Sequence, residues 1–142
     1  MTKRSIEQRA ETRRPAGRKP ARATLATARK VAGFAYDKKA VDLLVMDLRK
    51  VTDMTSFFIV CTGESGPQVK AIADNVLEKA RKAGMEIYNV EGYEALRWIL
   101  IDMIDIVVHV FQPDVRRYYQ LERLWGDAPV ERIGGGEAGS GD

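Results

Sequence analysis

The strongest constraint on the fold is the run Ile106–Phe111, in which every side chain except His109 is apolar. Successive side chains of a β-strand point to opposite faces, so a strand that is apolar at both parities has both faces covered. Two more short apolar runs, Val41–Leu48 and Phe57–Cys61, also read as buried strands. The sequence therefore predicts a sheet covered on both faces, with Ile106–Phe111 as a central strand.

Three predicted helices provide this cover. The first spans about residues 24–38, with Thr24 as its N-cap and apolar residues at helical spacing. The second follows Pro67, carries one apolar stripe and ends at Gly84. The third begins at Pro113, because proline is tolerated in a first helical turn. The side chains predicted to share its buried face are Val115, Tyr118, Leu121 and Trp125.

Two further strands, Glu86–Val90 and Arg97–Asp102, complete the pattern. The tight connection from Asp102 to Asp105 allows a local antiparallel pair. Strands and helices then alternate in the order α, β, β, α, β, β, β, α. This order predicts an α/β fold, in which a mixed five-stranded sheet is covered by helices as an α/β/α sandwich.

The charge of the chain is unevenly distributed. Residues 1–22 hold eight Lys/Arg and two acidic residues, whereas the rest of the chain has 15 basic and 18 acidic residues. A segment with so few apolar residues cannot offset the entropy of ordering, so 1–22 is predicted to be a disordered basic tail. Residues 23–131 are predicted to form one domain, and the glycine-rich residues 132–142 a flexible C-terminal tail.

The composition excludes several classes of protein. One cysteine and one histidine cannot form an internal disulfide or a four-ligand zinc site, so no structural metal is expected. No apolar run approaches the roughly 20 residues that span a bilayer, and the N-terminus lacks the apolar segment of a secretory signal. The sequence therefore predicts a cytoplasmic protein that does not associate with membranes.

No catalytic arrangement is evident from the spacing of residues. The Gly63–Gly66 turn could present backbone N–H groups to an anion, but it lacks both phosphate-binding glycine fingerprints. Asp47, Asp102 and Asp105 could suggest a metal cluster, yet the last two are expected to flank a turn. His109, within an apolar strand, is expected to have a structural hydrogen-bond partner. No nucleophile is paired with a base, so neither an enzyme nor a cofactor is predicted.

Aromatic residues gather in the second half of the chain. They are Tyr93, Trp98, Tyr118, Tyr119 and Trp125. Tyr118 and Tyr119 are neighbours in a predicted helix, so only one of them can face the core and the other should be more exposed. Because tyrosine and tryptophan are enriched at interface hot spots, this group indicates a surface that contacts a partner.

Several short sequence motifs between about Phe34 and Pro129 occur in the same order in a known protein family. Among them are Lys38-Lys-Ala40, Thr55-Ser-Phe-Phe-Ile-Val-Cys-Thr-Gly63, Val90-Glu-Gly92, Val107-Val-His-Val-Phe111 and Tyr118-Tyr-Gln-Leu-Glu-Arg-Leu-Trp125. Through these motifs the chain resembles the ribosome silencing factor family, also called the Iojap family.

The resemblance implies a factor that binds the large ribosomal subunit at ribosomal protein fourteen, blocks joining of the small subunit and represses translation without an active site. It also implies a fold similar to nucleotidyltransferase domains, and a homodimer when the protein is free. The residues it indicates as forming or supporting the ribosome-facing surface are Trp98, Asp105, His109, Tyr118, Tyr119, Glu122 and Trp125.

Some features fall outside this pattern. Ile104 stands in a turn where relatives usually have glycine, and isoleucine resists positive φ. The basic segment 1–22, beyond the region of resemblance, could contact ribosomal RNA. Two alternatives remain. The Gly63–Gly66 turn and the scattered aspartates suggest a metal-dependent nucleotidyltransferase, and the basic arm suggests an RNA-binding protein that acts through it. The bacterial cytoplasm is favoured over an organelle, because Glu7 and Glu11 are atypical of transit peptides.

Overall fold

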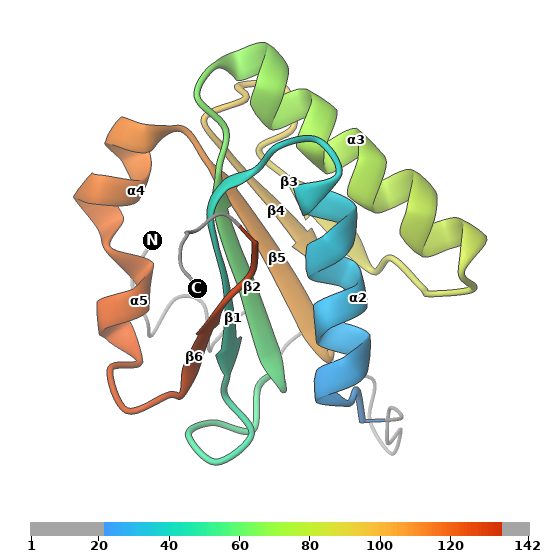
Figure 1. The fold of residues 1–142 in the computed structure, drawn as a ribbon, viewed down its shortest axis with the longest axis vertical. Coiled ribbons are helices and arrows are strands. Elements are labelled where there is room, and N and C mark those ends of the chain that lie inside the picture. Colours follow the sequence, from blue (N-terminus) through green and yellow to red (C-terminus); the bar gives the residue numbers. More distant parts are fainter. Residues whose placement is uncertain (1–21, 135–142) are drawn as a thin grey trace.

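The computed structural model describes residues 22–134, which form a mixed six-stranded sheet with helices on both faces (Figure 1). The elements are α2 (Leu25–Tyr36), β1 (Val41–Asp47), β2 (Phe57–Thr62), α3 (Gly66–Lys82), β3 (Asn89–Glu91), β4 (Trp98–Asp102), β5 (Ile106–Phe111), α4 (Pro113–Tyr119), α5 (Leu121–Leu124) and β6 (Val130–Arg132). The predicted tails 1–22 and 132–142 lie outside the described residues, apart from residue 22 and residues 132–134.

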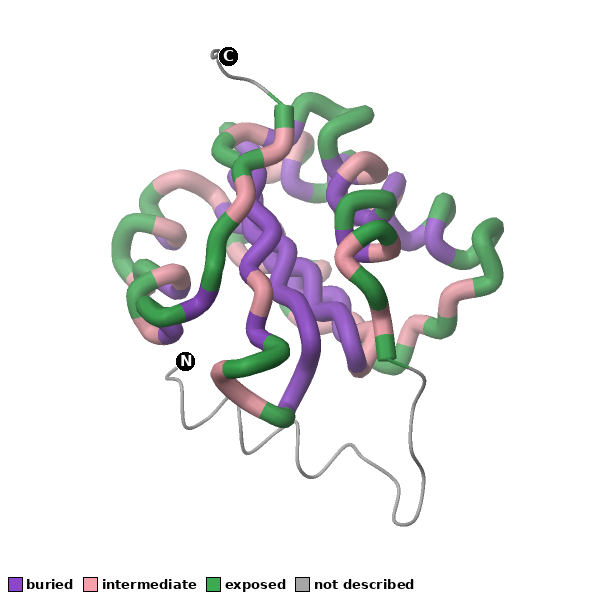
Figure 2. Tube along the Cα trace, turned by 60° about the horizontal axis from the view of Figure 1, so that its bottom comes forward, coloured by how far each residue is buried: buried purple, intermediate pink, exposed green. Residues whose placement is uncertain are grey.

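The strands lie in the order β3-β4-β5-β2-β1-β6. The two central strands, β2 and β5, are parallel, and every other neighbouring pair is antiparallel. The prediction that Ile106–Phe111 is central is confirmed, since all six of its residues are buried. Figure 2 shows these buried strands in the middle of the molecule.

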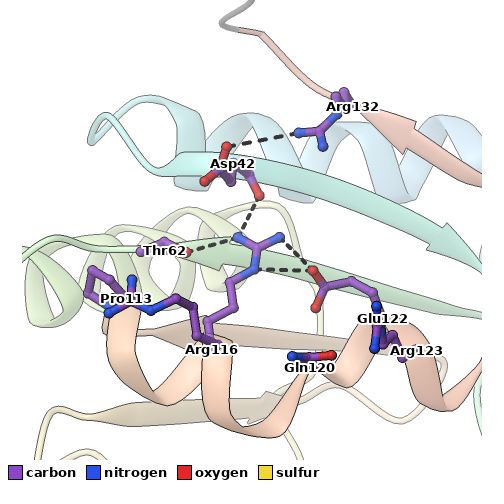
Figure 3. A pocket seen from close by; sticks show the side chains of 9 residues that line it. Asp42, Thr62, Pro113, Arg116, Gln120, Glu122, Arg123 and Arg132 are labelled. Atoms are coloured by element: carbon purple, nitrogen blue, oxygen red, sulfur yellow. Dashed lines mark hydrogen bonds and ion pairs between the residues drawn. The ribbon is translucent and has the colours of Figure 1, made fainter.

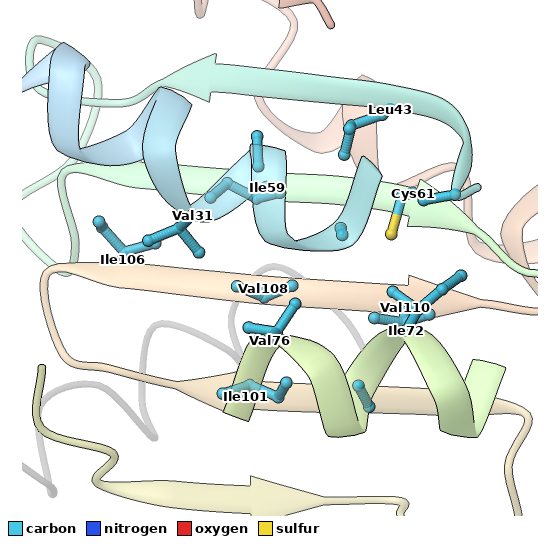
Figure 4. Packing of buried hydrophobic residues seen from close by; sticks show 14 of the residues in the cluster. Val31, Leu43, Ile59, Cys61, Ile72, Val76, Ile101, Ile106, Val108 and Val110 are labelled. Carbon is cyan, nitrogen blue, oxygen red and sulfur yellow. The ribbon is translucent and has the colours of Figure 1, made fainter. Parts of the chain in front are cut away.

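Alternating residues of the central strands build two separate cores. On one face, side chains such as Ile59, Val108 and Val110 pack against Val31 of α2 and Val76 of α3 (Figure 4). On the other face, the cluster joins residues of the strands to those of α4 and α5. Its central members are Phe58, Val60, Leu100, Val107, Phe111, Val115, Leu121 and Trp125. The odd-numbered and the even-numbered residues of each strand therefore contribute to different cores, which explains why these strands are apolar on both faces.

The predicted mixed α/β fold is confirmed, but the number of strands is corrected from five to six. β6 pairs antiparallel with β1 and begins at Val130, where the sequence predicted no strand. The strand predicted at Glu86–Val90 is shorter and later, since β3 covers only Asn89–Glu91. Both errors concern three-residue edge strands, which are held mainly by pairing with one neighbouring strand, β3 with β4 and β6 with β1, rather than by a local apolar pattern.

The predicted final helix is two helices. Gln120 lies between α4 and α5 with φ 45°, in the left-handed region, and interrupts the helix. The prediction that Tyr118 shares the buried face is wrong, because its side chain is 80% exposed. Val115, Leu121 and Trp125 are buried as predicted. The break changes the phase between the two helices, so their buried faces do not follow one continuous helical stripe.

The turn from β4 to β5 accepts a conformation that isoleucine rarely adopts. Ile104 has φ 70°, and its N–H donates to Asp102 Oδ1 at 2.8 Å. Asp105 then begins the return to β5, so Asp102 and Asp105 flank the turn, as predicted. Within residues 22–134, no helix is long and apolar enough to cross a bilayer.

Candidate functional site

An apolar groove lies where the first turns of α4 face the beginning of β4. This aromatic groove has a volume of about 590 Å³ and is lined by Ala95, Arg97, Trp98, Asp114, Val115, Tyr118 and Tyr119. Three of the seven predicted site residues therefore line one cavity. Its floor and walls are mainly apolar, whereas Arg97 and Asp114 add charge at its edge, in an ion pair of 2.7 Å.

Trp98 is fixed in this groove by contacts on several sides. Its indole Nε1 donates to His109 Nδ1 at 3.1 Å. Its ring centroid lies 4.7 Å from that of Phe111 and 4.9 Å from that of Tyr119. The half-buried indole is therefore held in one orientation, with part of its surface accessible to a partner.

His109 has the structural hydrogen-bond partner that the sequence predicted. Its side chain is fully buried, and burial lowers its pKa from 6.5 to about 3. The ring is therefore neutral at physiological pH. Because Nδ1 accepts the hydrogen bond from Trp98, the ring proton is carried by Nε2. His109 supports the groove from beneath and is not exposed in it.

A second layer of aromatic rings lies below His109. The Phe58 ring makes edge contacts with His109 at 4.5 Å and with Trp125 at 5.0 Å between centroids. Trp125 is 1% exposed. Of the predicted site residues, Trp125 and His109 thus form the interior support on which Trp98 rests.

Tyr118 is the most exposed aromatic side chain at this site. Its ring meets the neighbouring Tyr119 edge-on, with centroids 5.0 Å apart, and is otherwise directed away from the core. Tyr119 is half-buried against Trp98. The prediction that one tyrosine faces inwards and its neighbour outwards is confirmed, with Tyr119 as the inward one.

Glu122 lies on the other side of α4, in a second groove of about 490 Å³. This arginine groove is lined by Asp42, Thr62, Pro113, Arg116, Arg117, Gln120, Glu122, Arg123 and Arg132. Figure 3 shows Arg116 at its centre, extending from α4 toward β1 and β2. Its Nη1 donates to the Asp42 carbonyl oxygen at 2.7 Å and to Thr62 Oγ1 at 2.9 Å, and its Nη2 lies 3.2 Å from Glu122 Oε2.

Asp105 is not brought to either groove. The β4–β5 hairpin pairs Trp98 with Phe111 at one end and Asp102 with Val107 at the other, and Asp105 lies beyond that second end. Its side chain is buried and accepts hydrogen bonds from Ser56 Oγ, at 2.6 Å, and from the Ala23 N–H. Asp105 thus fastens the hairpin turn to the start of β2 and to the segment before α2.

The features considered for catalysis or metal binding do not form such a site. Ser65 caps α3 by accepting from Gln68 N–H, and the Glu64 N–H donates to Gln68 Oε1, so the turn satisfies its own donors. Asp47 forms an ion pair of 2.7 Å with Arg49 instead of joining Asp102. Among residues 22–134, no group of three or more His, Cys, Asp or Glu is placed to hold a metal ion.

Sequence reasoning missed the role of Arg116 and the ion pair between Arg97 and Asp114. Arg116 and Glu122 are six residues apart, which is not a helical contact spacing, and they meet only because Gln120 breaks the helix. Arg97 and Asp114 are 17 residues apart. Their pairing depends on the contact between β4 and α4, for which no local signal exists.

Comparisons with known proteins agree on one family. The family model described as "Ribosomal silencing factor during starvation" matches residues 21–140. The chain is similar to "Ribosomal silencing factor RsfS" of Halalkalibacterium halodurans, with 46% identity over 99 residues, 70% of this chain and 85% of that protein. It is also similar to the protein of the same name from Bacillus subtilis, with 43% identity over 102 residues, 71% of this chain and 86% of that one.

The fold has a counterpart among solved structures. A crystal structure of a protein from Chromobacterium violaceum aligns with a TM-score of 0.70 and 41% sequence identity. The alignment covers 73% of this chain and 88% of that protein. The arrangement of the sheet and its helices is therefore shared with a protein whose sequence is also related.

Proposed function

This chain belongs to the ribosomal silencing factor family, and from that membership we propose that it represses translation by binding the large ribosomal subunit at ribosomal protein fourteen. The bound protein then occupies the surface that the small subunit must approach. The family match carries the ribosomal role, while the choice of partner protein and the steric mechanism are the finer parts of the proposal.

The aromatic groove supports the proposal, because it offers the features of a protein-binding hot spot. Tyr118 is exposed, Trp98 is half-exposed and rigidly held, and the Arg97–Asp114 pair lies at the rim. Rigid aromatic side chains lose little entropy on binding and bury a large area each. A standard interface buries roughly 1,600 Å² in total, with a few such anchors dominating its free energy.

The predicted site residues would then divide by role. Trp98, Tyr118 and Tyr119 would contact the partner directly, whereas His109 and Trp125 would hold the groove in shape from the core. The remaining two, Glu122 and Asp105, lie elsewhere, Glu122 as the partner of Arg116 and Asp105 as a fastening of the hairpin turn.

The mechanism requires no chemical step, so we propose neither a catalytic residue nor a cofactor. Fold likeness to nucleotidyltransferases, which stays a prediction, would not by itself confer transfer activity. Such enzymes use paired carboxylates to hold metal ions, whereas Asp47 is paired with Arg49 here and Asp102 caps Ile104 N–H. The described residues offer no specific observation that favours the enzymatic alternative.

Three further parts of the proposal follow from the family and the sequence. We place the protein in the bacterial cytoplasm, where its ribosomal partner is found. We propose that the free protein forms a homodimer, and that the basic residues 1–22 add contacts to ribosomal RNA through their positive charge.

Co-sedimentation with purified large subunits tests the proposal, followed by addition of small subunits to measure joining. Tyr118→Ala removes an exposed ring and should leave the fold intact, while weakening binding by about tenfold or more, as expected for a hot-spot tyrosine. Tyr88→Ala is the matched control, since Tyr88 is 47% exposed outside the groove. Binding of the unaltered chain without any block of joining would contradict the steric mechanism, and equal binding by both variants would contradict the proposed surface.

A further inference from the structure

The arginine groove has a concentration of positive charge that the domain around it lacks. Beyond residue 22, acidic residues outnumber basic ones by 18 to 15. The lining of the groove nevertheless contains four arginines and only two acidic residues. The arginines come from three elements, with Arg116 and Arg117 on α4, Arg123 on α5 and Arg132 on β6.

The four arginines differ in whether their guanidinium groups are already paired within the protein. Arg116 has a side chain only 11% exposed and is committed to the protein, since Asp42, Thr62 and Glu122 accept all of its described hydrogen bonds. Arg117 and Arg123 are exposed, and within residues 22–134 neither of their guanidinium groups forms a hydrogen bond or an ion pair. Arg132 Nη1 lies 3.9 Å from Asp42 Oδ1, which is a long ion pair between two well-exposed side chains. Three guanidinium groups are therefore available to an external anion.

The floor of the groove is held in an uncommon backbone conformation. Asp42 and Gln120 are non-glycine residues at φ 48° and φ 45°, and both line the groove. Arg116 connects them, because its Nη1 donates to the Asp42 carbonyl oxygen and its own carbonyl oxygen accepts from the Gln120 N–H. Conformations of this kind have a free-energy cost and tend to occur at ligand sites, where the surrounding structure maintains them.

The lining indicates which part of a ligand would be recognised. None of the residues that line the groove is aromatic, so it offers no surface on which a base could stack. Guanidinium groups bind phosphate oxygens in a planar, often bidentate geometry. Arginines spread over α4, α5 and β6 suit successive phosphates of an extended polyanion better than one small molecule.

We infer that the arginine groove binds the sugar–phosphate backbone of RNA through Arg117, Arg123 and Arg132. The choice of RNA rather than DNA rests on the proposed ribosomal function, whereas the phosphate chemistry follows from the groove itself. This contact lies on the opposite side of α4 from the aromatic groove, so a partner protein and RNA can be bound at the same time.

Nuclear magnetic resonance on the full ¹⁵N-labelled chain tests the inference, with a twelve-nucleotide oligouridylate RNA as the probe. The amide of Gln120 and the side-chain Nε–H signals of Arg117 and Arg123 should shift and saturate. Raising the salt concentration should weaken this binding, and Arg117→Gln with Arg123→Gln should lower the slope of log K against log salt by about 1.4, since each lost contact to a single strand removes about 0.7. Arg81→Gln, at an exposed position near the end of α3, is the control for loss of charge elsewhere.

Other probes decide the nature of the ligand. Inorganic pyrophosphate and a hexaglutamate peptide should shift the same signals only at higher concentrations than the RNA. Equal or tighter binding of either would overturn the assignment to RNA backbone, and RNA-induced shifts confined to residues 1–22 would overturn the groove as a binding site. Because this measurement uses no ribosomes, its failure would leave the co-sedimentation result unaffected, so the two proposals fail separately.

Discussion

His109 gives a quantitative prediction for how the free energy of unfolding depends on pH. Its ring is fully buried, and burial lowers its pKa from 6.5 to about 3. In the unfolded chain the same ring is in water and has its ordinary pKa near 6.5. Between these two values the unfolded state binds one more proton than the folded state. The contribution of His109 is therefore fully present above pH 6.5 and is lost as the pH falls toward 3.

The size of the effect follows from this difference in proton binding. Well below pH 6.5, stability falls by about 1.4 kcal/mol per pH unit, and integration from pH 7 to pH 5 gives a loss of about 2 kcal/mol. The carboxyls of Asp47, Asp114 and Glu131 also have lowered pKa values, mainly through side-chain hydrogen bonds from neighbouring arginines. Desolvation opposes the lowering of the Asp74 pKa, but hydrogen bonds from Lys70 and Tyr93 outweigh it. The contributions of these carboxyls are lost at lower pH, as the unfolded carboxyls near pH 4 become protonated, and are similar in any variant that retains them.

His109→Gln isolates the histidine, because it is the only one in the chain. Glutamine keeps an oxygen that can accept from Trp98 Nε1 but does not titrate. Urea unfolding followed by tryptophan fluorescence at pH 7, 6 and 5 should show the unaltered chain losing about 2 kcal/mol more than the variant over this range. Parallel pH profiles for the two proteins would refute the assignment of a buried, neutral ring, whatever their absolute stabilities.

The remaining predictions concern two glycines and the cysteine. Gly92 has φ 77°, and a Cβ there would collide with the Trp98 carbonyl oxygen, so Gly92→Ala should cost at least about 2 kcal/mol in urea unfolding. Gly33→Ala is the matched substitution in α2, where a Cβ would meet no atom within 4 Å, and it should stabilise by about 0.5–1 kcal/mol. A stabilising Gly92→Ala or a destabilising Gly33→Ala would contradict these backbone assignments. Cys61 is buried and its pKa is raised to about 12 by desolvation, so Ellman's reagent should modify it only as fast as the protein opens. Complete modification of the native protein within seconds would contradict its burial.

The strands at the centre of the sheet could be predicted from sequence, because a strand that is buried on both faces is apolar along its whole length. Ile106–Phe111 and Phe57–Cys61 are apolar at both parities and became β5 and β2, almost at the predicted bounds. β6 has no such apolar pattern, since Val130 and Arg132 are exposed and the strand exists through its pairing with β1. β6 is therefore specified by non-local pairing, which a local sequence pattern does not reveal.

The same distinction applies to the candidate site. The aromatic residues could be identified from sequence, and the structure brings Trp98, Tyr118 and Tyr119 together along one groove. The interior positions of His109 and Trp125 could also be predicted, but the buried position predicted for Tyr118 is wrong, since its side chain is exposed. The packing of α4 on the sheet decides which tyrosine packs against Trp98, above His109 and the layer of Phe58 and Trp125.

The most consequential error concerns the helix predicted to continue from Pro113 to Trp125. In one continuous helix from Pro113, Tyr118 would follow Val115 by three residues and lie on the same buried face, with Trp125 seven residues further on. The left-handed Gln120 ends α4 before that pattern can continue, and α4 instead turns Val115 and Tyr119 inwards, four residues apart. Tyr118 is left exposed by this orientation of α4, whereas the break itself allows Arg116 and Glu122 to meet. The arginine groove thus depends on the left-handed conformation of Gln120, which the residue type does not indicate, whereas the aromatic groove depends on which face of α4 packs on the sheet.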